Sequence, residues 1–402
     1  MAGGTSEGKK QSFFHRLYVG TGAIDVIGHR KGLYIFFSAL VVVSLAFIAV
    51  KGFNFGIDFK GGTKVQLEAR ATSGQVISTD DVTKVYQDAL GATPEAVQAV
   101  GLGNSASIQI RTITLNAVDV DKLKNALTNQ LHPTGTISDS AVSGTWGGEV
   151  TQQALIALLV FLVLVTLFLA LYFERRMAAA ALVTLFHDVI VTAGVYSVIG
   201  FEVTPATAIG LLTILGFSLY DTVVVFDKVK ENTRGLLGLT RRTYGEAANL
   251  AVNQTLMRSI NTALIALLPV IGLFVVGALL LGVGTLQDLA LIQMTGLIVG
   301  VSSSIALATP LLVDMTMRDP RFKQQAKRVA SARKARAARL TTGASDEAAD
   351  VADDEPESFD KDAVDAHARR QRAMAAAGGV PVRNQRASDR HRRRTPQGKR
   401  QK

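Results

Sequence analysis

Six apolar runs, each long enough to cross a lipid bilayer, constrain the fold of this chain more than any other feature. A transmembrane helix needs about 20 mainly apolar residues, and 48% of the 402 residues are hydrophobic. The chain is therefore expected to be an α-helical polytopic membrane protein. The six predicted spans are residues 33–50, 153–173, 177–199, 206–227, 260–281 and 289–313.

Positive charge is distributed unevenly among the segments that flank these runs. Lysines and arginines lie in residues 1–32, at Arg175 and Arg176, in 228–259 and in 318–402, whereas the short connections at 200–205 and 282–288 have none. The positive-inside rule then predicts a multi-pass protein of the cell membrane with both termini in the cytoplasm and residues 53–148 outside. The first run is too long for a signal peptide and no small-residue cleavage site follows it, so we expect a retained anchor.

Residues 53–148 are polar and have the pattern of a small globular domain. Alternating apolar positions predict half-buried strands, and apolar stripes at helical spacing predict two amphipathic helices. The elements expected in order are a strand at 64–70, a helix between a cap at Ser78 or Thr79 and Gly91, strands at 97–101 and 107–112, a helix at 118–131 and a strand at 136–142. The order β-α-β-β-α-β is that of a ferredoxin-like α+β domain, a fold that does not by itself assign a function.

Two charged segments are expected on the cytoplasmic side. The connection 228–259 has apolar residues at helical spacing from Tyr244 to Leu256, which predicts an amphipathic helix lying along the membrane surface. The tail 318–402 consists of basic and acidic blocks with few aromatic residues, so it is expected to be largely disordered, with one helix at 321–340. The tail is either a solvated segment that holds the topology or a basic surface that attracts anionic membrane lipid or ribosomal RNA.

The stretch 216–232 places an acidic residue inside the fourth apolar run. Asp221 lies within the run, and Asp227 and Lys228 lie at its end. A charged side chain within a bilayer helix costs roughly 2.5–3.5 kcal/mol on insertion scales and marks a functional site by default. Asp227 and Lys228 are explained as a helix end that emerges into water. Asp221 lies about 9 Å further in, by the rise of an α-helix, and is predicted to be functional.

Other polar residues are expected inside the bundle. His187 and Asp188 lie near the middle of the third span, and four-residue spacing places Thr184, Asp188, Thr192 and Tyr196 on one stripe that should face protein. His187 is either a packed histidine or part of the site. Arg258, at the start of the fifth span, either extends to the membrane surface or meets Asp221 at matching depth. Together these residues indicate a proton relay rather than catalysis.

Several kinds of site are excluded or unsupported by the sequence. The chain has no cysteine, so it has no thiolate metal site. It has no phosphate-binding loop and no dinucleotide fingerprint, and no His and carboxylate cluster has the spacing of a zinc site. We therefore expect no metal, no cofactor and no enzymatic activity, with an ion gradient as the energy source.

Four motifs carry a resemblance to a known family. They are residues 56–63 (GIDFKGGT), 186–189 (FHDV), 218–232 at the end of the fourth span, and 253–259 (NQTLMRS). With these motifs and its six-span, one-domain layout, the chain resembles the SecF family, membrane subunits of the bacterial preprotein translocase in the RND superfamily. The resemblance covers about residues 30–315 and does not include the charged tail.

The resemblance implies a partner and a mechanism. Members of this family form one RND-type half, pair with the six-span SecD, and work with the SecYEG channel on a translocating preprotein, driven by the proton motive force. It also ties Asp221 and Arg258 to proton passage, and places Asp227 in the motif near the membrane interface. Where the family has arginine after the second aspartate this chain has Lys228, which keeps the charge but not a bidentate bond.

Some alternatives remain open from the residues alone. Gly61 and Gly62 permit a sharp turn with positive φ, and Asp58 either caps that turn or couples the 53–148 domain to the spans. Instead of a proton-driven export subunit, the chain could be an RND-type exporter half for small molecules or lipids, or a scaffold that conducts no protons.

Overall fold

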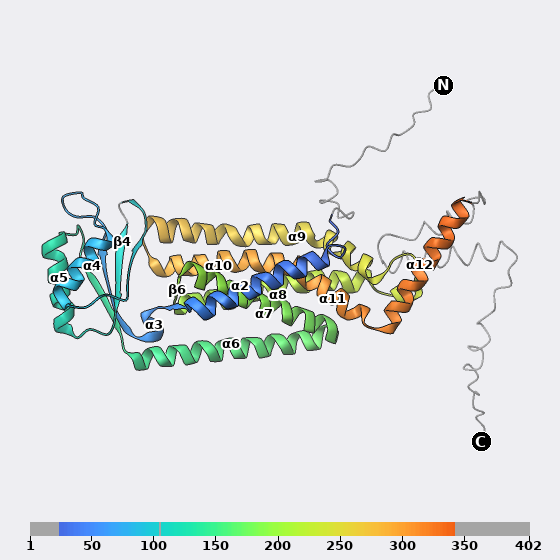
Figure 1. Ribbon diagram of the computed structural model, residues 1–402, viewed down its shortest axis with the longest axis horizontal. Helices are drawn as coiled ribbons and strands as arrows, with labels where there is room; N and C mark the ends of the chain where they lie inside the picture. The colour runs from blue at the N-terminus through green and yellow to red at the C-terminus, as the bar shows by residue number, and fades with distance from the viewer. Residues whose placement is uncertain (1–23, 104–105, 342–402) are drawn as a thin grey trace, which may run out of the picture. The chain divides into compact units, whose positions relative to one another are not determined.

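The computed structural model describes residues 24–103 and 106–341, and in this part of the chain six helices are long and apolar enough to cross a membrane. They run alongside one another, with an α+β domain at one end (Figure 1). The prediction of a six-span membrane protein with a small α+β domain is confirmed. The spans are formed by α2 (Arg30–Lys51), α6 (Gly144–Tyr172), α7 (Arg175–Ile199), α8 (Pro205–Asn232), α9 (Tyr244–Gly272) with the π-helical η3 (Leu273–Leu280), and α10 (Gly284–Ser303) with the π-helical η4 (Ser304–Ala308) and α11 (Thr309–Met317).

The expected surface helix at 244–256 is wrong, because α9 runs without a break from Tyr244 into the fifth span. Thr243 and Glu246 form a capping box that starts the helix, and no glycine or proline follows between Glu246 and Pro269. The first turns pack against the segment before α2. Asn249 accepts a hydrogen bond from the amide of Val26 at 2.9 Å, and Asn253 accepts one from the amide of Ile24 at 2.9 Å.

The α+β domain has the ferredoxin-like topology predicted for it. Its sheet is antiparallel, with the strand order β3-β4-β2-β5, and its two helices lie on one side of the sheet (Figure 1). The elements are β2 (Gly62–Glu68), α4 (Thr79–Leu90), β3 (Ala96–Val100), β4 (Ser107–Thr112), α5 (Ala117–Leu131) and β5 (Ser138–Val142). The core joins Val65 and Ile110 of the sheet to Val82 and Leu123 of the helices.

The cap of α4 gives a small, local prediction. Ser78 accepts a hydrogen bond from the amide of Asp81 at 3.1 Å, and the Asp81 carboxylate accepts one from the amide of Ser78 at 3.3 Å. Ser78→Ala is expected to destabilise α4 by about 1 kcal/mol, seen as faster hydrogen exchange of its first amides in the full chain. Ser140→Ala, on an exposed position of β5, is the control. Equal exchange in α4 of both variants would contradict the capping role.

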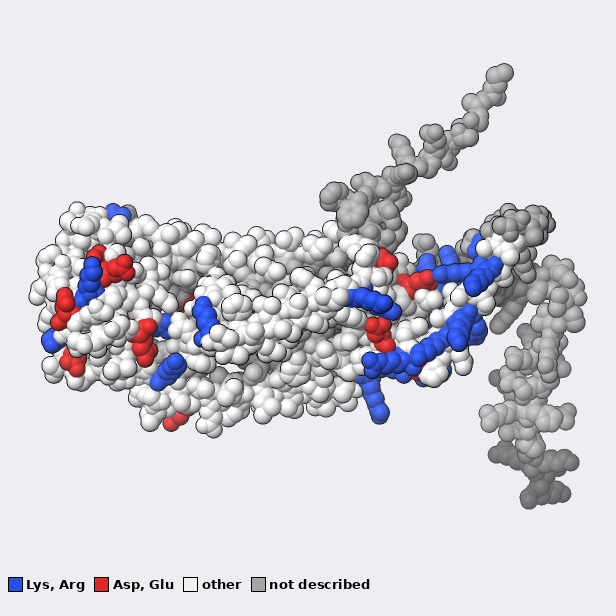
Figure 2. Space-filling model, viewed as in Figure 1, with Lys and Arg blue, Asp and Glu red and all other residues white. Residues whose placement is uncertain are grey.

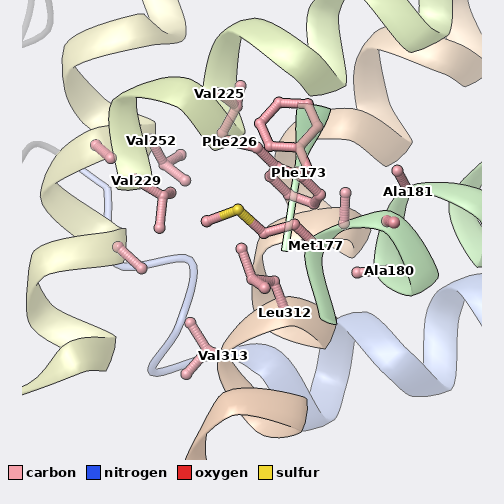
Figure 3. Close-up of a cluster of buried hydrophobic side chains, with 14 of the residues drawn as sticks. Phe173, Met177, Ala180, Ala181, Val225, Phe226, Val229, Val252, Leu312 and Val313 are labelled. Carbon is pink, nitrogen blue, oxygen red and sulfur yellow. The ribbon is translucent and has the colours of Figure 1, made fainter. Parts of the chain in front are cut away.

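Close packing in the bundle depends on small residues and on an apolar cluster. Figure 3 shows that cluster, in which Met177 of α7 lies among side chains of α8, α9 and α11 such as Phe226, Val252 and Leu312. Elsewhere glycines let helices touch. A Cβ atom on Gly194 of α7 would lie 2.2 Å from the side chain of Ser44 on α2. The helices are therefore held together both by this apolar cluster and by close approach at glycine.

Charged side chains lie mainly at the ends of the spans. Figure 2 shows lysine, arginine, aspartate and glutamate over the α+β domain and around α11 and the start of α12, with an almost uncharged band between. The helix expected at 321–340 is α12 (Pro320–Thr341). The expected disorder of the remaining tail, residues 342–402, and the expected position of residues 1–23 lie outside the described residues.

Candidate functional site

Asp221 lies in the middle of the bundle where three helical segments meet. It is on α8 and 6% exposed. Its carboxylate accepts two hydrogen bonds, one from Ser259 of α9 at 2.5 Å and one from Ser304 of η4 at 2.5 Å. Ser304 begins a π-helical segment, an irregularity that is frequent at functional sites. The carboxylate is therefore held by hydroxyl groups from two neighbouring spans.

Asp188 forms a second buried carboxylate site on α7. It is 1% exposed, and Ser218 of α8 donates a hydrogen bond to its Oδ2 at 2.5 Å. His187 Nδ1 lies 3.0 Å from its Oδ1, and the histidine ring packs edge-on against Phe37 at 5.2 Å. The predicted stripe of Thr184, Asp188, Thr192 and Tyr196 is buried throughout, as expected.

The two carboxylates are connected through α8. Ser218 and Asp221 are three residues apart and therefore share a helix face. Both line a cavity of about 20 Å³, together with Ser259 of α9 and Gly300 of α10, which is room for about one water molecule. A hydroxyl can donate to a carboxylate and accept from a carboxylic acid. The serine partners of Asp188 and Asp221 can therefore bind either carboxyl group in its protonated or its ionised form, and the small cavity lies between Ser218 and Asp221.

The predicted contact between Asp221 and Arg258 is not present among the described residues. Arg258 donates instead to the hydroxyl of Tyr220 at 3.3 Å, and its side chain is exposed on the side of the bundle. Neighbouring helix residues are separated by about 100°, so the rotation that aims Ser259 at Asp221 turns Arg258 away. This part of α9 does lie at the depth of Asp221, since Ser259 reaches the carboxylate, but the Arg258 side chain does not point toward it.

Sequence reasoning missed the importance of Ser259 and Ser304. Ser304 is fully buried and donates to Asp221. Its signal in the sequence was three consecutive hydroxyl residues inside an apolar span. Within residues 24–103 and 106–341, no group of three or more His, Asp or Glu side chains could hold a metal ion.

Asp227 and Lys228 lie apart from this site. Asp227 is exposed, and Lys228 donates to Glu231 at 2.9 Å on the same helix. Both residues belong to the last turns of α8, as expected for a helix end that leaves the membrane. Neither contacts Asp221 in the described part of the chain.

Gly61 and Gly62 form an elbow between the first span and the domain. They follow the short α3 (Ile57–Lys60) and have φ of 79° and 135°. A Cβ on Gly61 would lie 2.7 Å from the backbone of Gly144, and one on Gly62 would lie 2.5 Å from the carbonyl of Thr112. The turn predicted at this pair is confirmed. The role of Asp58, as a cap of this turn or in coupling the domain to the spans, stays a prediction.

Comparison with protein families identifies the same regions. Residues 122–318 match the family described as protein export membrane protein SecD/SecF, C-terminal. Residues 46–72, which contain the elbow, match the SecD/SecF GG motif. Asp188, Asp221 and the three serines that bind them all lie within residues 122–318.

Proteins of known identity are similar to this chain over most of its length. The protein translocase subunit SecF of Mycobacterium tuberculosis is 54% identical over 326 residues, which are 79% of this chain and 73% of that protein. SecF of Streptomyces coelicolor is 40% identical over 386 residues, 96% of this chain and 97% of that protein. The crystal structure of SecDF from Thermus thermophilus is similar with a TM-score of 0.63 and 28% identity, over 73% of this chain and 38% of the longer SecDF chain.

The described spans, the glycine elbow and these relatives agree on one assignment. The chain is a multi-pass membrane protein of protein export, and it belongs to the SecF family.

Proposed function

We propose that this chain uses the proton motive force to assist the passage of exported preproteins through a SecYEG channel. The observation that carries the proposal is the buried Asp221, which is held by two serine hydroxyls and shares a small cavity with Ser218, the hydrogen-bond partner of Asp188. A carboxyl group with hydroxyl partners can take up and release a proton without leaving a partner unsatisfied. Transfer of each proton across the membrane supplies about 2.3 kcal/mol per 100 mV.

Protons are the coupling ion in this proposal, and the chain needs no cofactor and performs no covalent chemistry. The distribution of lysine and arginine supports an orientation with both termini in the cytoplasm and the α+β domain outside. In that orientation the domain meets the exported chain, and the carboxylate site lies within the membrane beneath it.

The exposed residues beside Asp221 support a second membrane subunit of the SecD type. Arg258 is exposed, and Tyr220, which binds it, is 48% exposed. An arginine facing hydrocarbon costs roughly 2.5–3.5 kcal/mol, so a protein partner on this face removes that cost. The relative from Thermus thermophilus is named SecDF and has a longer chain.

Two substitutions test the relay. Asp221→Asn and Arg258→Ala are expected to reduce export of a secreted protein to the level of cells that lack this chain. The first variant cannot carry a proton, and the second loses the exposed arginine that we expect to meet a partner subunit. Export is measured with the membrane potential intact, and the assembled complex is quantified in parallel.

Asp227→Asn is the matched control, since it neutralises an exposed aspartate on the same helix and is expected to leave export unchanged. Normal export by both test variants in assembled complexes would contradict the relay and leave a scaffold that conducts no protons.

A second candidate function rests on a separate cavity of about 810 Å³. It lies at the domain end of α6 and α8, with Phe55, Phe59 and Trp146 near the domain and Leu158 and Leu211 deeper in the bundle. Its volume is that of a site for a small molecule, which favours an RND-type exporter half for lipids or small molecules. Loss of lipid or drug efflux in a deletion strain with normal secretion would support that function over protein export.

A further inference from the structure

Arg111 and Glu202 form a buried ion pair outside the carboxylate site. Arg111 lies on β4 of the α+β domain, and Glu202 lies on β6 (Glu202–Val203), in the short connection between α7 and α8. The guanidinium Nη1 is 3.3 Å from the Glu202 carboxylate, and the two side chains are 5% and 10% exposed. The pair therefore joins the domain directly to the two helices that carry Asp188 and Asp221.

Arg111 also binds the segment that follows the first span. Its guanidinium donates to the side-chain oxygen of Asn54 at 3.1 Å and to the carbonyl of Phe55 at 3.3 Å. These two residues form β1 (Asn54–Phe55), which pairs in parallel with β6. One arginine thus contacts both strands of this small sheet, which we call the junction.

We propose that Arg111 is a positioning residue. It fixes the position and orientation of the α+β domain relative to those ends of α7 and α8 that lie next to the domain. The inference rests on the proposed function, because a fixed position of the domain matters for export only if proton binding and release at Asp188 and Asp221 are transmitted to the domain. Arginine suits this task since its planar fork fixes direction as well as distance. A buried ion pair adds little net stability on average, whereas its loss leaves a buried charge without a partner.

The charge balance at Glu202 agrees with a geometric rather than a stabilising role. Burial raises the pKa of Glu202, while Arg111 and Lys64 of β2 oppose the rise and Asp58 adds to it. Asp288 of α10 is the other carboxylate near Glu202. An acid with a raised pKa contributes stability below its unfolded pKa that is lost as pH rises through the folded pKa. Burial therefore disfavours the ionised form of Glu202, so the contact with Arg111 is better explained by geometry than by a gain in stability.

Gly56 gives independent support from the other side of Glu202. A Cβ atom at Gly56 would lie 2.6 Å from the Glu202 carboxylate oxygen, although the backbone φ of −67° suits any residue. The amide of Gly56 also donates to the carbonyl of Val203 at 2.9 Å. Glycine at this position leaves the space that the carboxylate occupies, and Gly56→Ala should displace Glu202 with Arg111 untouched.

The test compares Arg111→Gln, Arg111→Lys and Gly56→Ala in the full-length chain. Arg111→Gln is expected to speed hydrogen exchange at residues 54–56 and 202–204 at least about tenfold, the effect of losing hydrogen bonds to a charged group. It should also remove most of the export that depends on the proton motive force. Arg111→Lys keeps the charge but not the planar guanidinium, so it should retain an intermediate level of export. Gly56→Ala should resemble Arg111→Gln in both hydrogen exchange and export.

The control is Lys124→Gln, which breaks the partly exposed pair of Lys124 and Asp139 within the domain and should change neither measurement. Unchanged exchange at the junction in Arg111→Gln, or faster exchange with normal export, would overturn the proposal. An equal loss of export in Lys124→Gln would overturn it as well. Asp221→Asn separates the two ideas, because it should stop export without altering exchange at the junction.

Discussion

Gly62→Val is expected to prevent the protein from accumulating in folded form. Gly62 has φ of 135°, a conformation that side chains with a Cβ rarely adopt, and its Cβ would lie 2.5 Å from the carbonyl oxygen of Thr112. Backbone strain alone costs about 1–3 kcal/mol, and the collision adds to it at the first residue of β2, where the strand pairs with β4 and β5. A folded protein has only about 5–15 kcal/mol of stability in total. The measurement is the amount of monodisperse protein extracted from membranes.

Gly74→Val separates strain from collision. Gly74 has a similarly positive φ of 85°, yet nothing lies within 4 Å of a Cβ placed there. This control should lose about 1 kcal/mol and still fold. If both variants accumulate equally, the close contact with Thr112 does not explain the glycine pair.

The parts of the fold with a strong periodic signal could be predicted from the sequence. Long apolar runs and alternating strands depend on local patterns, so the spans and the order of the α+β domain were predicted correctly. Asp188 and Asp221 could be singled out because the cost of burying a carboxylate in a membrane does not depend on structural detail. The turn at Gly61 and Gly62 could be predicted because paired glycines between two elements indicate a positive φ.

The missed features depend on helix rotation and on very short elements. A serine in an apolar span usually bonds its own helix, so only the rotation of α9 and η4 shows that Ser259 and Ser304 reach Asp221. The same rotation turned Arg258 onto Tyr220. The two-residue strands β1 and β6 have no periodicity to detect, so neither the junction nor the role of Arg111 could be read from the sequence.

Asp188→Asn is expected to abolish the proton-motive-force-dependent part of export while the protein remains folded. Asparagine has the shape of aspartate, and its amide oxygen can still accept the hydrogen bond from Ser218. Hydrogen bonds between membrane helices contribute only about 0.6 kcal/mol on average, so a weakened bond cannot account for a large defect. What the variant loses is the ability to bind and release a proton. Export is assayed beside extraction yield, so that function and folding are measured on the same membranes.

Thr192→Val is the matched control for Asp188→Asn, because Thr192 lies on the same stripe of α7 and is equally buried at 1% exposure. It removes a polar group without touching a carboxylate and should export normally. If Asp188→Asn also exports normally at full yield, proton transfer does not extend beyond Asp221, and the bond from Ser218 only joins α7 to α8. If Asp188→Asn loses export while Thr192→Val exports normally, export requires a carboxyl group at position 188. Asparagine keeps the shape and polarity of aspartate, and Thr192→Val shows that loss of a buried polar group from this stripe is tolerated.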